Sequence, residues 1–208
     1  MIVKSGILFA VVFSSLAFVF VIPQFVWTKV IAALMFLLCI FVLFFFRDPG
    51  RLINSSASVL LAPADGKVLS CEKLESSDIG QCQVVRIFLS IFNVHIQRSP
   101  INGTVQNIER KKGAFKAAYK KEASEENAKN TIIIKGDKIT VAVTQIVGLI
   151  ARRIECWVKV NEAVEQGQKI GFIRFGSQVD IFMPSSVELC VKPGDNVKAG
   201  ITKIGVLE

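Results

Sequence analysis

The fold is decided near the C-terminal end of the chain, where the sequence reads Lys169-Ile-Gly-Phe-Ile-Arg-Phe175-Gly176-Ser177-Gln-Val179-Asp-Ile-Phe-Met183. Two β-like runs, Lys169–Phe175 and Val179–Met183, meet at the pair Gly176-Ser177. Glycine adopts backbone angles that other residues avoid, so the pair first of all predicts a bend between two strands. A chemical role for the serine depends on the rest of the sequence.

Similar runs recur upstream. They are rich in β-branched and aromatic residues and are separated by turn residues: Val84–Phe92, Thr131–Lys135, Lys138–Val147 and Ala151–Cys156. Short strands with turn signals about every 8–12 residues predict an all-β sandwich or barrel. Residues 109–130 are charged and alanine-rich, and they predict a short helical excursion from the sheet. We therefore expect a mainly β, sandwich- or barrel-like domain.

An internal repeat surrounds the same stretch. Val164-Glu-Gln-Gly167 and Val197-Lys-Ala-Gly200 are each followed by an Ile-Gly pair. Such repeats are typical of the sandwich folds of biotinyl and lipoyl carriers. A carrier presents a lysine between the two copies, and here no lysine lies between Lys169 and Lys192. The repeat predicts a biotinyl/lipoyl-like fold and argues against the carrier function.

The first 46 residues form a separate hydrophobic region, in which only Lys4 and Lys29 are charged. Ile7–Ile22 is a marginal membrane span, whereas Phe25–Phe46 is long enough to cross a hydrocarbon core. A cleaved signal peptide is disfavoured, because no small-residue cleavage pattern separates the two runs. We predict a helical hairpin, spanning or re-entrant, as a membrane anchor over residues 1–46, and a catalytic domain over 47–208.

Charge indicates the partner and the side of the membrane. The 208 residues carry a formal net charge of +8, and Arg47 and Arg51 follow directly after the second apolar run. By the positive-inside rule the domain faces the cytoplasm. Each basic residue near an anionic leaflet contributes about 1 kcal/mol of attraction. No nucleic-acid motif accompanies the charge, so the expected partner is the cell (inner) membrane. The five cysteines show no C-x-x-C spacing, as expected of reduced thiols.

Three residues supply the elements of an Asp–His–Ser triad. Asp65 belongs to an Asp-Gly pair, His95 is the only histidine, and Ser177 follows Gly176. In such a triad the histidine takes the serine proton and the aspartate fixes the histidine tautomer. Spacing does not show that the side chains meet, and each residue also has a structural interpretation, as a turn or a buried histidine.

Six segments, in order, resemble the short prokaryotic type of pyruvoyl-dependent phosphatidylserine decarboxylases: Phe46–Arg51, Ala62–Val68, Phe92–His95, Glu126–Asn130, Gly148–Ile154 and Gly171–Ser177. The resemblance implies self-cleavage between Gly176 and Ser177, with Ser177 Oγ attacking the Gly176 carbonyl and His95 as base. β-Elimination and hydrolysis would leave a pyruvoyl group at position 177. The β chain (1–176) and α chain (177–208) would stay together as a heterodimer.

The resemblance also implies the reaction. The pyruvoyl group, used without a metal or pyridoxal phosphate, would form a Schiff base with the phosphatidylserine amine, release CO2 and yield phosphatidylethanolamine. Arg47, Arg51, Arg152 and Arg153 are candidate headgroup contacts. Phe92 stands where some longer relatives carry a second histidine, so a division of proton transfer between two histidines is not implied.

Three alternatives stay open at this level. An archaetidylserine decarboxylase acts on the same headgroup attached to ether-linked chains. A membrane-anchored Ser-His-Asp hydrolase would use the same three residues in an intact chain. A carrier-like or lipid-binding module would also stay intact and would show no ketone. The sequence does not fix the oligomeric state.

Overall fold

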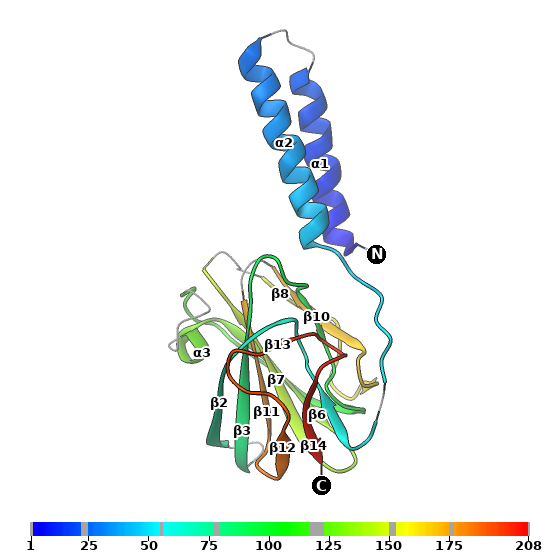
Figure 1. The fold of residues 1–208 in the computed structure, drawn as a ribbon, viewed down its shortest axis with the longest axis vertical. Helices are drawn as coiled ribbons and strands as arrows, with labels where there is room; N and C mark the ends of the chain where they lie inside the picture. The colour runs from blue at the N-terminus through cyan, green and yellow to red at the C-terminus, as the bar shows by residue number, and fades with distance from the viewer. Residues whose placement is uncertain are drawn as a thin grey trace. The chain divides into compact units, whose positions relative to one another are not determined.

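The computed structural model describes residues 2–21, 25–54, 56–76, 80–116, 123–149, 153–174 and 177–207. The chain divides into two compact units, Met1–Gly50 and Arg51–Glu208. Figure 1 shows the helices of the first unit and the strands of the second. Each unit is described by itself.

The first unit is a pair of apolar helices, α1 (Lys4–Val21) and α2 (Val26–Phe45). They contact each other through small and weakly polar groups: Cys39 Sγ lies 3.4 Å from Ser14 Oγ and 3.6 Å from the Ala10 carbonyl oxygen. Their outward surfaces are apolar as well, as the exposed rings of Phe18 and Trp27 show. In length and composition α2 suffices to cross a membrane, whereas the apolar part of α1 is shorter. The predicted N-terminal helix pair is confirmed.

The second unit is built around one antiparallel sheet that curls into half a barrel (Figure 1). Its strands lie in the order β13 (Asn196–Val197), β2 (Gly66–Ser76), β3 (Gly80–Leu89), β11 (Ser177–Pro184), β7 (Thr140–Val147), β6 (Lys129–Lys135), β5 (Gly103–Lys111) and β9 (Ala163–Val164). Because side chains alternate between faces, one face of β11 places Val179, Ile181 and Met183 in the hydrophobic core.

Two three-stranded sheets complete the domain. One orders β1 (Val59–Leu61), β14 (Lys203–Leu207) and β12 (Val187–Leu189); the other orders β4 (Ile96–Arg98), β10 (Lys169–Ile173) and β8 (Ile154–Cys156). The mainly β prediction is confirmed. The predicted charged excursion contains the short helix α3 (Ala123–Glu126), but its first residues extend β5, where Glu109 to Lys111 pair with Thr131 to Lys129.

The internal repeat recurs in three dimensions. In the first copy β9 leads through Gly167 into β10, and in the second β13 leads through Gly200 into β14. Both glycines have positive φ angles, 82° and 70°, as the left-handed turn position requires. The two turns approach each other: a Cβ added at either glycine would lie within 3 Å of the Ile53 side chain.

Candidate active site

Ser177 is the first residue of β11 and lies between two neighbouring strands, paired with Leu89 of β3 and Val147 of β7. By alternation its side chain shares the core-facing side with Val179. Ser177 is fully buried, and its Oγ has no hydrogen-bond partner among the described residues. A buried hydroxyl without a hydrogen-bond partner lowers the stability of the folded state by about 1–3 kcal/mol. A chemical role for the hydroxyl would explain why the fold tolerates this loss. Gly176, the other half of the predicted cleavage site, lies outside the described residues.

His95 lies at the same end of the sheet. It follows β3, whose last residue Leu89 pairs with Ser177, and it precedes β4, which pairs with β10. The Ile173 amide donates to the His95 carbonyl at 3.3 Å, only a few residues before Ser177. The histidine is fully buried. The segment that carries His95 is therefore held next to the segment that carries Ser177 on two sides, by the pairing of β3 with β11 before His95 and by the pairing of β4 with β10 after it.

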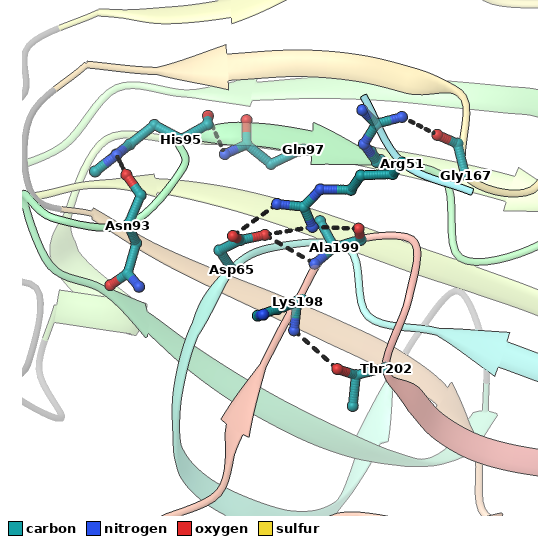
Figure 2. A network of polar contacts seen from close by, with 10 residues as sticks. Arg51, Asp65, Asn93, His95, Gln97, Gly167, Lys198, Ala199 and Thr202 are labelled. Carbon is teal, nitrogen blue, oxygen red and sulfur yellow. Dashed lines mark hydrogen bonds and ion pairs between the residues drawn. The ribbon is translucent and has the colours of Figure 1, made fainter. Parts of the chain in front are cut away.

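The His95 ring is oriented by a backbone carbonyl. Nδ1 lies 2.9 Å from the Asn93 carbonyl oxygen, and Figure 2 shows the ring extending toward Asn93. Since a carbonyl can only accept, Nδ1 carries the proton and Nε2 is the basic nitrogen. In this tautomer Nε2 is the nitrogen that can accept a proton.

A buried chain of amides supports the backbone of His95, and sequence reasoning missed it. Gln97 Nε2 donates to the His95 carbonyl at 2.7 Å (Figure 2), Gln145 Nε2 donates to Gln97 Oε1 at 2.8 Å, and Asn130 Nδ2 donates to Gln145 Oε1 at 2.8 Å. All four residues are buried. The available signal was an amide at a core position of an apolar strand, where a polar group needs a partner.

Asn127, within one of the segments quoted for the resemblance, fixes the strand next to Ser177. Its Nδ2 donates to the carbonyls of Val147 and Lys116, both at 2.8 Å, and its Oδ1 accepts from the Lys116 amide. Val147 is the pairing partner of Ser177. Asn127 therefore links the 114–116 segment to the strand end that holds the serine.

Asp65 has other partners than the sequence suggests. Its carboxylate forms a bidentate pair with Arg51, Nη1 to Oδ1 and Nη2 to Oδ2 both at 2.7 Å, and Oδ1 also accepts from the Ala199 amide at 2.9 Å. Figure 2 draws these contacts apart from the contact between His95 and Asn93. In the described contacts, then, the Asn93 carbonyl takes the orienting position at Nδ1 that the triad prediction assigned to Asp65.

The four candidate headgroup arginines have different surroundings. The Arg51 side chain is 6% exposed and contacts Asp65 and the Ala199 carbonyl within the domain. In the first unit, Arg47 donates to the Phe44 carbonyl at 2.8 Å and lies over the Phe44 ring. Arg153 is exposed, and Arg152 lies outside the described residues.

A second buried acid lies on the same strand as the serine. Asp180 faces away from the core side of β11 and accepts from Gln178 Nε2 at 2.6 Å, while Arg86 Nε lies 3.5 Å from its Oδ2. Burial raises the pKa of Asp180 to about 6, against the opposing effects of the Gln178 hydrogen bond and the Arg86 charge. A single acid in an apolar strand gave no motif, so the sequence did not indicate it.

The structure thus combines a carrier-like β repeat, which has no lysine between Lys169 and Lys192, with a buried serine at a strand start and a buried histidine that a backbone carbonyl orients. The family model for phosphatidylserine decarboxylase matches residues 38–205. The chain belongs to the phosphatidylserine decarboxylase family.

Individual proteins similar to this chain carry the name of the same family. The chain is 42% identical over 170 residues to a phosphatidylserine decarboxylase proenzyme of Desulfotalea psychrophila, covering 79% of this chain and 78% of that protein. It is 42% identical over 174 residues to the proenzyme of Trichlorobacter lovleyi, covering 83% and 80%. It is 42% identical over 173 residues to the proenzyme of Burkholderia pseudomallei, covering 82% and 80%.

Proposed function

We propose that this chain is a proenzyme that cleaves itself between Gly176 and Ser177 and then decarboxylates phosphatidylserine. The names of its relatives support the substrate and the proenzyme state. The observation that carries the proposal is the buried Ser177 Oγ at the start of an inner strand, without a described hydrogen-bond partner. That position suits a residue that reacts once with its own backbone.

In this proposal His95 acts as the base. Its Nε2 accepts the proton of Ser177 Oγ when the hydroxyl attacks the Gly176 carbonyl, and the Asn93 carbonyl keeps the ring in the required tautomer. Ser177 and its surroundings fit a covalent pyruvoyl group, because the residue is enclosed by β3 and β7 and its Oγ has no described partner to lose. Once formed, that group supplies a carbonyl that accepts the electrons released with CO2.

Cleavage would leave two chains in one domain. Residues 177–208 contain β11, which is hydrogen-bonded on both sides by β3 and β7 and contributes Val179 and Ile181 to the core. The ladder bonds and the buried apolar surface would hold the α chain in place without a peptide bond. We therefore propose an αβ heterodimer as the working unit.

The enzyme would work at the cytoplasmic face of the cell membrane, with residues 1–46 as the anchor. A diacyl lipid leaves a bilayer at a cost of about 0.8 kcal/mol per CH2 group, so the site must reach the headgroup. Two strongly exposed apolar side chains, Phe92 and Leu149, follow the ends of β3 and β7, the strands on either side of Ser177. We propose that this end of the sheet meets the lipid surface.

Intact-mass measurement of the denatured protein tests the proposal. We expect two species that divide at Gly176-Ser177, the smaller one reactive toward carbonyl reagents. Ser177→Ala should give one inactive 208-residue chain, whereas Ser186→Ala, an exposed serine on the same segment, should cleave and react normally. A single intact chain with activity would refute self-cleavage and favour the serine hydrolase. Comparing diacyl with ether-linked serine lipids separates the archaetidylserine alternative.

The membrane-facing end is tested by fluorescence of the full-length protein in vesicles. Leu149→Trp should add emission that lipids with brominated acyl chains quench. Leu74→Trp is the control, because Leu74 is also exposed but lies at the opposite end of the sheet, in the β2–β3 hairpin. Equal quenching at the two positions would contradict the proposed orientation.

A further inference from the structure

Arg51 and Asp65 together bind the backbone of a single residue, Ala199. The Ala199 amide donates to Asp65 Oδ1 at 2.9 Å, and the Ala199 carbonyl accepts from Arg51 Nη1 at 2.5 Å (Figure 2). The two side chains also form a bidentate ion pair and are largely buried, with 6% and 11% exposure. One peptide segment thus has both a donor and an acceptor satisfied by a charged pair.

The first copy of the internal repeat contains an uncharged counterpart of this arrangement. Pro63-Ala-Asp65-Gly66 corresponds to Pro100-Ile-Asn102-Gly103, and Gly66 and Gly103 pair with Val197 and Val164 at equivalent places. Asn102 Oδ1 accepts from the Gln166 amide at 2.7 Å, as Asp65 Oδ1 accepts from the Ala199 amide. Both side chains therefore cap the residue just before a left-handed glycine.

The two caps differ in what they connect. Asn102 and Gln166 both belong to residues 1–176, whereas Asp65 and Arg51 belong to that segment and Ala199 belongs to 177–208. Near its turn the second copy is also attached through the two-residue strand β13, through backbone bonds of Asp195 and Gly194 to Val68, and through the Ala62 backbone, which bonds to the Gly200 amide and the Thr202 carbonyl. Only in this copy does the cap join the two products of the proposed cleavage.

We propose that Arg51 and Asp65 form a clasp that keeps the α chain on the domain after cleavage. Charged hydrogen bonds are roughly twice as strong as neutral ones, and loss of one partner of a buried charged pair mainly raises the dissociation rate. The Arg51–Asp65 pair thus stands in the second copy where the first has the neutral Asn102 side chain, and only the second copy loses its covalent connection when the Gly176–Ser177 bond is cleaved. Both residues are positioning residues in this role, since they act through Ala199. The inference rests on the proposed self-cleavage.

The test follows release of the α chain from full-length protein. The protein is immobilised in detergent through an N-terminal tag, and the mass-verified fragment 177–208 is measured over time in sub-denaturing urea. Arg51→Met should still cleave but should lose the fragment about tenfold faster than the wild type or more. Arg51→Lys, which retains the charge but not the bidentate geometry, should fall between them.

Asn102→Ala is the matched control, because it removes the equivalent cap within one chain. It should lower the stability of the whole domain without faster release of the fragment. Equal release from Arg51→Met and Asn102→Ala would overturn the clasp and leave self-cleavage intact. Arg51→Met that stays uncleaved, while Arg51→Met/Ser177→Ala is folded, would instead assign the pair to processing. If Arg51→Met does not fold, wild-type release from Arg51→Lys overturns the clasp. Wild-type protein that stays one chain would overturn the proposed function and the clasp together.

Discussion

The two copies of the repeat build the same turn with different chemistry. Each has a two-residue strand, a capped amide and a left-handed glycine, and each then enters a five-residue strand. The first copy caps its turn with the neutral Asn102, and the second uses Asp65 held by Arg51. Because one backbone geometry accepts either cap, the turn itself does not require a charge, and the reason for the charge lies in what the turn is attached to.

The largest expected difference between the copies is the cost of deleting the cap. Asp65→Ala leaves the Arg51 guanidinium buried without its carboxylate and should lower the free energy of unfolding by about 3–5 kcal/mol. Asn102→Ala removes a neutral acceptor and should cost about 1–2 kcal/mol. Urea unfolding in the uncleaved Ser177→Ala background measures both. Equal costs would show that the charge in the second copy has no energetic consequence.

The comparison also shows what a sequence can and cannot predict. The V-x-x-G spacing and the turn residues were sufficient for the repeat and the mainly β fold, because both depend on local patterns. The same local rules predicted a bend at Gly176-Ser177 with the next strand starting at Val179, whereas β11 already begins at Ser177. The partner of Asp65 did not follow from local rules, since an Asp-Gly pair, a lone histidine and a serine suggest a triad whatever the contacts are. Only the three-dimensional arrangement shows Asn93 at the His95 ring and Arg51 at Asp65.

Other misses have the same cause. The amide chain from Asn130 through Gln145 to Gln97 joins residues of three strands, so no single stretch of sequence could predict its hydrogen bonds. The extension of β5 to Lys111 depends on pairing with β6 and overrides the charged composition that favoured a helix. Non-local hydrogen bonds thus decided the features that local patterns did not.

The coupling between Arg51 and Asp65 should be the next largest effect. Because each residue alone leaves a buried charge behind, Arg51→Met/Asp65→Asn should cost less than the sum of the two single changes. We expect a coupling free energy of about 1.5–3 kcal/mol in the uncleaved background, from a double-mutant cycle measured by urea unfolding. Asp65→Asn recreates the amide of the first copy. Additive costs would mean that Arg51 and Asp65 stabilise the turn independently.

Asp180 lies beside Arg86, as Asp65 lies beside Arg51, but its stability contribution should depend on pH. Its pKa is raised by burial to about 6 from an unfolded value near 3.8, so the native state holds the proton more tightly than the unfolded state. The Asp180 contribution should therefore fall as pH rises from about 4 to 6 and then stay constant. Asp180→Asn should flatten this slope and raise stability at pH 7 by about 2 kcal/mol, measured by urea unfolding at several pH values. An unchanged slope would mean that Asp180 is ionised like a surface carboxylate.

The smallest expected effect is the extra cost of an alanine at Gly167 or Gly200 compared with an alanine at Gly194. Gly167→Ala and Gly200→Ala both place a Cβ against Ile53 in a left-handed backbone, and the Gly200 variant also approaches Arg98 Cδ at 3.0 Å. Gly194→Ala is the control, since its φ is also positive but an added Cβ meets nothing within 4 Å. We expect about 1 kcal/mol of strain at Gly194 and about 1–2 kcal/mol more at the other two, with Gly200 slightly the larger. Thermal unfolding in the Ser177→Ala background measures the differences. Adding Ile53→Ala should reduce the excess most at Gly167, where the three atoms nearest to the added Cβ all belong to Ile53. If the excess persists there without the isoleucine side chain, steric contact between the copies is not its cause, and the strain belongs to each turn separately.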